Sequence, residues 1–167
     1  DITQGVQINK DGAPVGSLII PTTALPTGVS GVTGSITYLD PETDDILSMP
    51  GGDLLALPEG ADPNDGQVTL ETFGMMEFDL VDQDGNPITE LAIDETAEVC
   101  MKATSGLVVG DVIPLWYYDE DAGLWKEEGE GTVVNRDGEL LICGGVGHFS
   151  WWNYDQPITT HSCMRYS

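Results

Sequence analysis

Basic residues are scarce in this sequence: 5 Lys and Arg stand against 29 Asp and Glu, which gives a formal net charge of -24. Proteins that bind nucleic acid or anionic membrane surfaces rely on Lys and Arg to neutralise phosphate groups. We therefore expect no nucleic-acid partner. Cations and basic proteins suit such an acidic surface better as partners. A saline exterior also suits it, because salt screens the repulsion between carboxylates.

Long apolar runs are also missing. The sequence has no apolar stretch of about 18 residues, the minimum for a candidate membrane-spanning helix. We therefore expect no membrane insertion. Hydrophobic residues nevertheless make up 40% of the 167 residues, and the mean hydropathy is -0.08, so the chain has enough apolar material for a folded core.

Helical periodicity is nearly absent, and 21 Gly and 10 Pro would interrupt any long helix. Asp-Gly pairs at residues 11–12, 84–85 and 137–138 each lie between apolar or alternating runs. Such pairs favour tight hairpin turns, because both residues tolerate a positive φ. Three hairpins of this kind indicate an all-β chain.

Short runs with the composition of strands follow one another along the sequence. The predicted strands comprise residues 5–9, 15–20, 35–39, 67–72, 75–81, 87–91, 97–103, 112–118, 124–129, 132–135 and 139–143. Their regular spacing predicts an antiparallel β-sandwich with an extended, loop-rich N-terminal part. Residues 1–66 are expected to supply N-terminal strands and a long acidic loop that pack on the main sandwich of residues 67–167, as one structural unit.

The 3 cysteines fit no zinc-binding spacing and form no C-x-x-C motif. Residues 97–103 alternate strictly, which places Cys100 on the outer face of a strand, within reach of a neighbouring strand. Cys143 also lies in a predicted strand, whereas Cys163 lies close to the end of the sequence. In an exported protein we expect Cys100 to pair with Cys143, leaving Cys163 free or linked to another chain, although spacing alone does not fix the connectivity.

Acidic loops make calcium the one cofactor that the sequence suggests. Asp82, Asp84 and Asn86 offer oxygen atoms at alternate positions around an Asp-Gly turn, and calcium prefers about six to eight oxygen ligands. The same residues suit a solvated hairpin turn, and no Glu occupies the last position of an EF-hand loop. Calcium binding and a plain turn stay open as alternatives.

One stretch carries the residues for a specific reaction: glycine-rich residues 144–147 precede His148, Phe149 and Ser150. The Ser150 hydroxyl is placed to attack the Phe149 carbonyl in an N-to-O acyl shift, with His148 as base or orienting group, giving an ester that water opens. The glycines would allow the unusual backbone dihedrals that a strained bond needs. The alternative is an ordinary half-buried strand, in which Phe149 and Trp151 face the same side.

No other catalytic signature is present. The chain has 2 His and neither a G-x-S-x-G nor an H-E-x-x-H motif. We therefore expect no enzyme activity beyond this intramolecular autoproteolysis.

The His-Phe-Ser tripeptide resembles the motif of autoproteolytic ZU5 domains and of the nuclear-pore autoproteolytic domain. The wider runs at residues 70–76, 113–120 and 123–129 resemble the extracellular module of cartilage intermediate layer protein and the FAM171 family, and similar runs occur in bacterial surface proteins. This resemblance covers residues 16–163 and is strongest over residues 113–155. It implies a secreted or cell-surface β domain within a longer protein, and it does not imply an enzyme.

These features together predict an extracellular structural or interaction module that serves adhesion or matrix assembly in a larger surface protein. Its partners would be other proteins or copies of itself. Self-cleavage between Phe149 and Ser150 is the first alternative function, and calcium-dependent adhesion is the second.

Overall fold

The computed structural model describes residues 6–10, 13–40, 43–44, 49–50, 55–104 and 106–157. Their regular structure is β-strand, apart from one 3-10 turn, η1 (Thr22–Ala24), so the all-β prediction is confirmed. None of the described segments is a helix long and apolar enough to cross a membrane. The strands are β1 (Val6–Lys10), β2 (Ala13–Ile19), β3 (Val32–Leu39), β4 (Leu55–Leu57), β5 (Val68–Asp82), β6 (Ala97–Lys102), β7 (Val112–Asp119), β8 (Leu124–Arg136), β9 (Glu139–Val146) and β10 (Trp151–Pro157).

Several predicted strands are parts of longer ones. The strands predicted at residues 67–72 and 75–81 form the single strand β5, and those at 124–129 and 132–135 form β8. Glycines interrupt the side-chain pattern of both, but partner strands continue the backbone hydrogen bonds past them. Residues 87–91 form no strand, because only isolated bridges join this segment to its neighbours.

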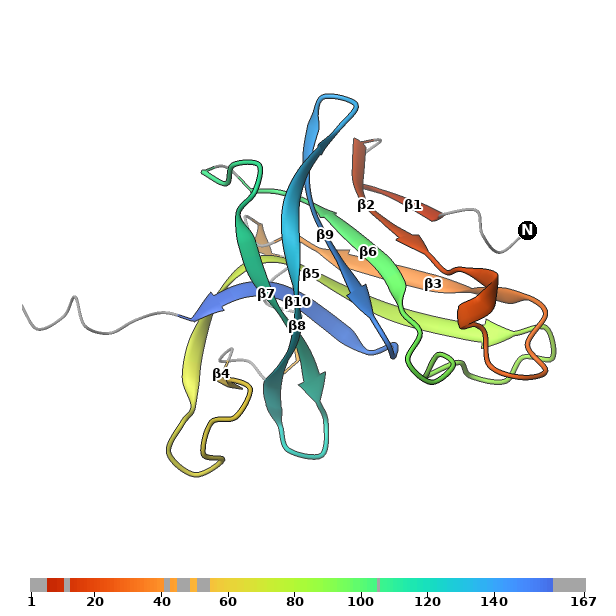
Figure 1. The fold of residues 1–167 in the computed structure, drawn as a ribbon, viewed down its shortest axis with the longest axis horizontal. Coiled ribbons are helices and arrows are strands. Elements are labelled where there is room, and N and C mark those ends of the chain that lie inside the picture. Colours follow the sequence, from red (N-terminus) through yellow and green to blue (C-terminus); the bar gives the residue numbers. More distant parts are fainter. Residues whose placement is uncertain are drawn as a thin grey trace, which may run out of the picture.

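The strands belong to one hydrogen-bonded sheet that closes on itself (Figure 1). β4, β5, β10, β7 and β8 follow one another around a five-strand barrel, which the β7–β8 pairing closes. Beyond β8 the sheet continues outward through β9, β6, β2 and β1, while β3 pairs along β5. Among the pairs in the described part of the chain, only β4 with β8 is parallel.

The predicted sandwich is not confirmed, because the hydrogen-bonded ladder is continuous and does not divide into two stacked sheets. The reason lies in the length of two strands. β5 has 15 residues and β8 has 13, so each extends beyond the barrel. The far end of β5 pairs with β3, and the far end of β8 pairs with β9. Strands this long bend and twist enough to close a barrel.

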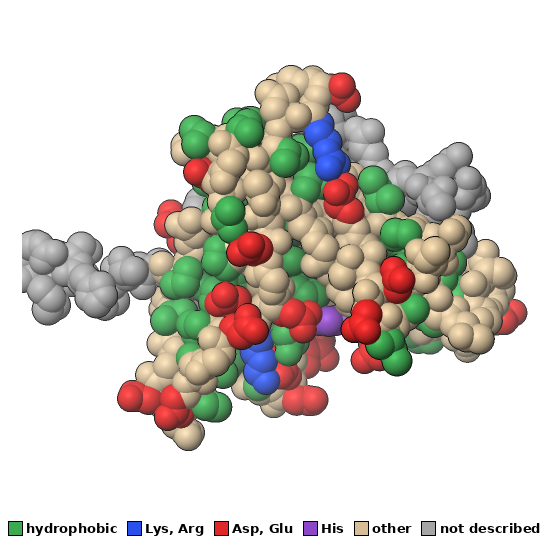
Figure 2. Space-filling model, viewed as in Figure 1, with side chains coloured by type: hydrophobic (Ala, Val, Ile, Leu, Met, Phe, Trp, Pro, Cys, Tyr) green, Lys and Arg blue, Asp and Glu red, His purple; other side chains and the backbone are tan. Residues whose placement is uncertain are grey.

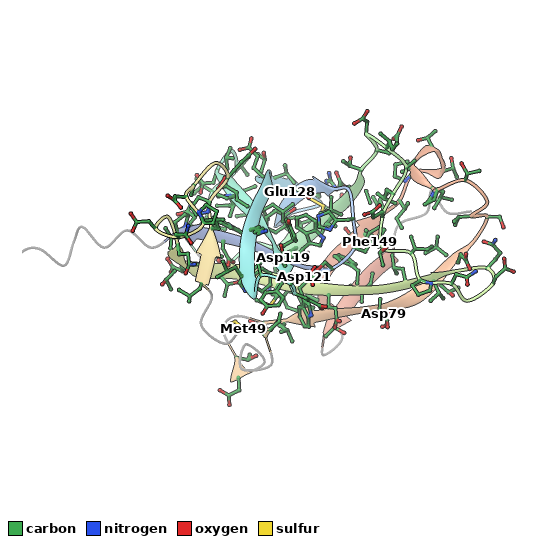
Figure 3. The ribbon with its side chains drawn as sticks, turned by 90° about the horizontal axis from the view of Figure 1, so that it is seen from below. Met49, Asp79, Asp119, Asp121, Glu128 and Phe149 are labelled. Carbon is green, nitrogen blue, oxygen red and sulfur yellow. A yellow bond between two sulfur atoms is a disulfide. The ribbon has the colours of Figure 1, made fainter. Side chains whose placement is uncertain are left out.

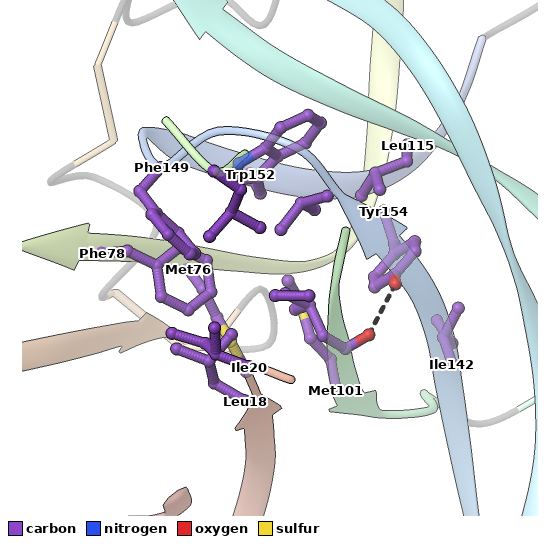
Figure 4. Packing of buried hydrophobic residues seen from close by; sticks show 14 of the residues in the cluster. Leu18, Ile20, Met76, Phe78, Met101, Leu115, Ile142, Phe149, Trp152 and Tyr154 are labelled. Atoms are coloured by element: carbon purple, nitrogen blue, oxygen red, sulfur yellow. Dashed lines mark hydrogen bonds between the residues drawn. The ribbon is translucent and has the colours of Figure 1, made fainter. Parts of the chain in front are cut away.

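The two faces of this curled sheet bury two apolar cores. The barrel core fills the interior of the barrel; its buried members are Leu39, Ala56, Leu70, Met75, Trp116 and Trp125, and Trp151 packs against them. The outer core lies on the other face of the barrel wall, beneath the outer strands (Figure 4). Its largest members include Trp152, Tyr154, Met76 and Phe78.

The predicted disulfide between Cys100 and Cys143 is confirmed. The two residues lie directly opposite each other on β6 and β9, with 4.1 Å between their Cα atoms. Alternate residues of β6, such as Val99, point into the outer core, as the pattern predicted. Cys163 lies outside the described residues.

The hairpin predicted at Asp137 and Gly138 is also confirmed. Arg136 pairs with Glu139, so the loop has only these two residues, and their φ values are 53° and 87°. Two consecutive positive φ values define a type I′ turn. The first Asp-Gly pair, at residues 11–12, lies outside the described residues, although β1 and β2 pair on either side of it.

Candidate functional site

The His-Phe-Ser stretch lies in the connection between β9 and β10. Two backbone hydrogen bonds hold it against the segment around β5: the Phe149 N–H donates to the Thr89 carbonyl (2.8 Å), and the Phe78 N–H donates to the Ser150 carbonyl (3.3 Å). No described peptide bond is cis, so the Phe149–Ser150 bond is trans. The predicted cleavage point is therefore anchored on both sides.

The prediction that Phe149 and Trp151 face the same side is wrong. Phe149 is buried in the outer core, with its ring centroid 5.8 Å from that of Phe78, whereas Trp151 packs on the barrel core. Trp152, the next residue, joins Phe149 in the outer core. Two-residue alternation fails here because regular strand geometry begins only at Trp151.

His148 is held in one orientation. Its Nε2 lies 2.7 Å from Oε2 of Glu128 on β8. An ionised carboxylate only accepts hydrogen bonds, so we assign the donated proton to Nε2; in a neutral imidazole with this tautomer, Nδ1 is the acceptor. The imidazole also meets the edge of Tyr117 and lies 4.6 Å from the Trp152 ring, whose Nε1 donates to the His148 carbonyl.

The Ser150 hydroxyl is directed toward β7, where it donates to the Tyr118 carbonyl at 3.3 Å. The structure therefore brings His148 and Ser150 into one pocket without a hydrogen bond between their side chains. An acyl shift would require the Ser150 side chain to rotate toward the Phe149 carbonyl.

The glycines before His148 have ordinary backbone dihedrals, and Gly144 is needed for close packing. None of Gly144, Gly145 and Gly147 has a positive φ. A Cβ on Gly144 would lie 2.6 Å from the Glu130 carbonyl oxygen and 2.9 Å from the Tyr154 hydroxyl. The expectation of strained dihedrals is wrong at these positions, and at Gly144 the fold instead needs space for the Glu130 backbone and Tyr154.

Two open pockets meet at His148. The first has a volume of about 470 Å³, and its acidic lining residues are Glu77, Asp119 and Glu120. The second has a volume of about 520 Å³, and its acidic lining residues are Glu90, Asp94, Glu95 and Glu128. Of the described residues, no Lys or Arg lines either pocket. We call His148 and these carboxylates the His148 surface; Figure 2 shows the histidine in purple with acidic side chains in red on both sides.

A lysine lies close to one end of this surface. Nζ of Lys126 is 2.6 Å from Oδ2 of Asp119, and this hydrogen bond, supported by the Ala122 N–H, lowers the pKa of Asp119 below its usual value. Figure 3 labels Asp119, Asp121 and Glu128 on the β7–β8 hairpin. The surface therefore keeps a strong excess of negative charge.

An exposed apolar side chain stands at the rim of the second pocket. Ile93 is 90% exposed and occupies a turn closed by a hydrogen bond from the Glu95 N–H to the Ala92 carbonyl (3.0 Å). Asp94 in the same turn has φ 63°, a left-handed conformation that non-glycine residues seldom adopt. Such conformations gather at functional sites, where the surrounding structure maintains them.

The candidate calcium ligands do come together, as a hydrogen-bonded turn. Oδ1 of Asp82 accepts from the N–H groups of Asn86 (2.9 Å) and Asp84 (2.8 Å), and its Oδ2 accepts from the Asn86 side chain (3.4 Å). These hydrogen bonds, with that from the Asn86 backbone the largest cause, lower the pKa of Asp82. Calcium binding at this turn stays a prediction.

One cluster of His, Cys, Asp and Glu side chains with metal-ligand spacing is found in the described part of the chain: Glu98, Cys100 and Cys143. Both sulfur atoms belong to the disulfide, so they are not available as thiolate ligands. This cluster is a disulfide with a neighbouring carboxylate.

The sequence analysis missed a buried polar group in the barrel. Asn153 and Asp155 on β10 are both 0% exposed. The Thr72 hydroxyl donates to Oδ1 of Asn153 at 2.6 Å, and Nδ2 of Asn153 donates to Oδ2 of Asp155. The signal was present in the sequence as polar residues at alternate positions of an aromatic strand, but that pattern is typical of a solvated face.

No protein-family model, curated protein or solved structure significantly matches this chain. The fold and the site define an all-β protein with a closed five-strand barrel, a cross-strand disulfide and an acidic surface around one histidine. The family resemblance of the sequence stays a prediction.

Proposed function

We propose that this chain is an extracellular interaction module, serving adhesion or matrix assembly in a larger surface protein, and that it binds a basic partner segment on the His148 surface. The observation that carries the proposal is the pair of pockets that share His148 and are lined by carboxylates without a lysine or arginine among the described residues. The Cys100–Cys143 disulfide supports an exported location, because such bonds persist in oxidising compartments.

The chemistry of the surface defines the partner. Clefts lined by charges of one sign concentrate the electrostatic field of the protein, and this field speeds the association of an oppositely charged ligand. The exposed Ile93 adds an apolar contact at the rim, and apolar anchors surrounded by polar groups commonly contribute much of the binding energy of an interface. The partner segment is therefore expected to carry Lys or Arg together with at least one apolar side chain.

Titration calorimetry with a synthetic peptide of Arg and Leu residues tests this proposal, with a peptide of Glu and Leu as the negative control. We expect binding of the basic peptide that weakens with added salt. The double variant Glu90→Gln/Glu128→Gln is expected to bind about tenfold more weakly, because it removes two carboxylates of the second pocket. A matched variant, Glu71→Gln/Glu139→Gln, removes the same charge from exposed positions outside both pockets. If both variants lose the same affinity for the basic peptide, binding depends on net charge alone, and a local site is contradicted.

Self-cleavage between Phe149 and Ser150 is a second candidate function, and the Glu128–His148 pair favours it. A carboxylate that fixes an imidazole in one tautomer is the arrangement that a general base needs. In the proposed reaction His148 takes the proton of Ser150 Oγ as this oxygen bonds to the Phe149 carbonyl carbon, and delivers it to the Ser150 nitrogen, which leaves as a free amine. Water then opens the ester to the Phe149 carboxyl group and the Ser150 hydroxyl. β10 would stay bound after cleavage, because it pairs with β5 on one side and β7 on the other.

Intact mass measurement of the denatured, reduced protein tests this second function. Cleavage predicts two species, residues 1–149 and 150–167, and the Ser150→Ala variant is expected to stay whole. Ser35→Ala, at an exposed position of β3, is the matched control and should cleave like the parent. A parent chain that stays whole through long incubation while folded excludes self-cleavage and leaves the binding proposal untouched.

A further inference from the structure

The barrel core contains three polar side chains that are hydrogen-bonded in a chain, Thr72 to Asn153 and Asn153 to Asp155. Thr72 on β5 lies opposite Asp155 on β10, and Met75 lies opposite Asn153. Two residues of β5 therefore oppose Tyr154 alone, a bulge that brings Thr72 toward the Asn153 amide. The bulge allows a hydroxyl, an amide and a carboxylate to meet between two neighbouring strands.

The Thr72 hydroxyl is close to the carbon of the Asn153 amide. Its oxygen lies 2.6 Å from Oδ1 of Asn153. Because a carbonyl bond is about 1.23 Å long, the hydroxyl oxygen is at most about 3.8 Å from the amide carbon Cγ. The Gly74 N–H donates to the same hydroxyl oxygen at 3.2 Å, which holds it in place while its own hydrogen is directed at Asn153.

The carboxylate contacts the group that would leave. Oδ2 of Asp155 accepts a hydrogen bond from Nδ2 of Asn153, and Asp155 is fully buried. The indole N–H of Trp116 donates to the Asp155 backbone carbonyl at 3.0 Å, which fixes this part of β10. A proton can therefore pass between the amide group and a carboxylate that is already in contact with it.

The surroundings would protect an ester once it formed. The barrel core around the group consists of buried apolar side chains, among them Leu70, Met75, Trp116 and Trp125. Water is excluded from such an interior, so hydrolysis of an ester is slowed. Thr72 itself is only partly buried, so it is the member of the group nearest to solvent.

We propose that Thr72 and Asn153 form an intramolecular ester cross-link, with Asp155 as the proton carrier. The Thr72 oxygen bonds to Cγ of Asn153, and its proton passes to Oδ1. The Asp155 carboxylate then accepts that proton from Oδ1 and delivers it to Nδ2, so the carbonyl forms again, the C–N bond breaks and ammonia leaves. The carboxylate returns to its starting state, and the net change is one alcohol and one amide converted to one ester and ammonia.

The cross-link would join β5 and β10 covalently inside the barrel. These strands are hydrogen-bonded neighbours, and the two residues are separated by 81 positions in the sequence. A covalent bond at this place prevents β10 from detaching when the chain is pulled or partly unfolded. This property is independent of the His148 surface, which lies on the connection before β10.

Intact mass measurement of the full chain, denatured and reduced, tests the proposal. Loss of ammonia predicts a mass about 17 Da below that of the sequence. Thr72→Val keeps the shape of the side chain and removes the hydroxyl, so this variant is expected at full mass. Thr72→Ser keeps the hydroxyl and is expected to show the deficit, which makes it the matched control.

Peptide mapping locates the bond. A digest of the parent protein is expected to contain one linked pair, a peptide with residue 72 joined to a peptide with residue 153. Hydroxylamine cleaves esters and leaves ordinary amides intact, so it should separate the pair. Asp155→Asn removes the proton carrier and is expected to keep most of the chain at full mass.

Two results would overturn the cross-link. A folded parent protein that stays at full mass after long incubation shows that the group does not react. A deficit that persists in Thr72→Val indicates cyclisation of an asparagine onto its own backbone, because that reaction also releases ammonia and needs no Thr72. Cleavage at Phe149–Ser150 splits the chain into two species and is distinguished from either result in the same spectrum.

Discussion

The phenolic hydroxyl of Tyr154 donates a 2.8 Å hydrogen bond to the backbone carbonyl of Val99, which joins β10 to β6 across the outer core (Figure 4). Tyr154 is 0% exposed, and this burial, with a smaller effect of Glu98, raises the pKa of the hydroxyl. The hydroxyl therefore stays protonated and keeps its role as donor. One side chain thus links the last described strand to the disulfide-bearing strand.

Replacing Tyr154 by Phe removes this donor and leaves the Val99 carbonyl buried without its partner. An unsatisfied buried acceptor costs about 1–3 kcal/mol, so we expect the free energy of unfolding to fall by that amount. Urea unfolding followed by tryptophan fluorescence measures the change. Tyr118→Phe, which removes a hydroxyl from a partly exposed ring, is the control and should change stability by much less.

Replacing Gly131 by Ala tests the close packing around the same ring. An added Cβ would lie 2.3 Å from Cε1 of Tyr154, so the ring or the strand must shift. We expect a loss of about 1–3 kcal/mol or more, the usual cost of overpacking a core. Gly31→Ala is the control, since its Cβ would meet only the Gln83 Cβ at an ordinary 3.7 Å. Equal stability of the two variants would contradict the packing described here.

Removing the disulfide is expected to cost about 2–4 kcal/mol, because it closes a loop across a separation of 43 residues and restricts the unfolded chain. The double variant Cys100→Ala/Cys143→Ala avoids leaving one unpaired thiol in place. Thermal unfolding of the parent with and without reductant provides a second measurement. A variant as stable as the oxidised parent would show that the bond does not constrain the unfolded state.

The ion pair between Glu98 and Arg136 predicts a pH dependence of stability. The guanidinium hydrogen-bonds the carboxylate at 2.8 Å and 3.2 Å and lowers the pKa of Glu98 below its ordinary value. A group whose pKa is lowered on folding stabilises the fold above its unfolded pKa, and this contribution is lost as the pH falls through the folded pKa.

We therefore expect Glu98→Gln to be less stable than the parent at pH 7, and the difference to vanish in acid below the usual glutamate range. The pair is partly exposed to solvent, so the effect is small, about 0.5 kcal/mol and screened by salt. Unfolding curves collected from neutral to acidic pH measure it. A difference that grows on acidification would have the wrong sign.

The calcium prediction has a direct test in thermal unfolding. If Asp82, Asp84 and Asn86 bind calcium, millimolar calcium raises the melting temperature by linkage beyond the effect of NaCl at equal ionic strength. Asp82→Asn should remove that extra rise. Asp65→Asn, which removes an exposed carboxylate from another loop, is the control. Equal shifts in all three proteins would assign the effect to charge screening.

Some features of the fold follow from short stretches of sequence. Asp137 and Gly138 form the predicted tight turn because the positive φ of each residue is a local preference. Cys100 was placed on a strand by the alternation of residues 97–103 and Cys143 by the strand-like run that contains it, and these strands are neighbours. Local backbone chemistry sufficed for these features.

The strand boundaries and the side-chain alternation predicted from the sequence were wrong where pairing with distant strands outweighs the preferences of the local residues. Each of β5 and β8 was predicted as two strands. β5 continues because its pairing with β10 resumes on both sides of a bulge at residues 73–74, and β8 continues because Gly131 pairs with Ile113. The alternation expected through Phe149 and Trp151 failed because the connection before β10 is irregular and is held by backbone contacts to Thr89 and Phe78.

The sequence alone was therefore enough to predict an all-β chain, an acidic surface and one tight hairpin, since these depend on composition, two-residue periodicity and turn preference; the predicted disulfide needed the structure to fix its pairing. Barrel closure, the carboxylates gathered around His148 and the meeting of Thr72 with Asn153 were decided only in three dimensions. Each depends on the register between strands far apart in the chain, and a shift of one residue in that register would send these side chains to the opposite face of the sheet.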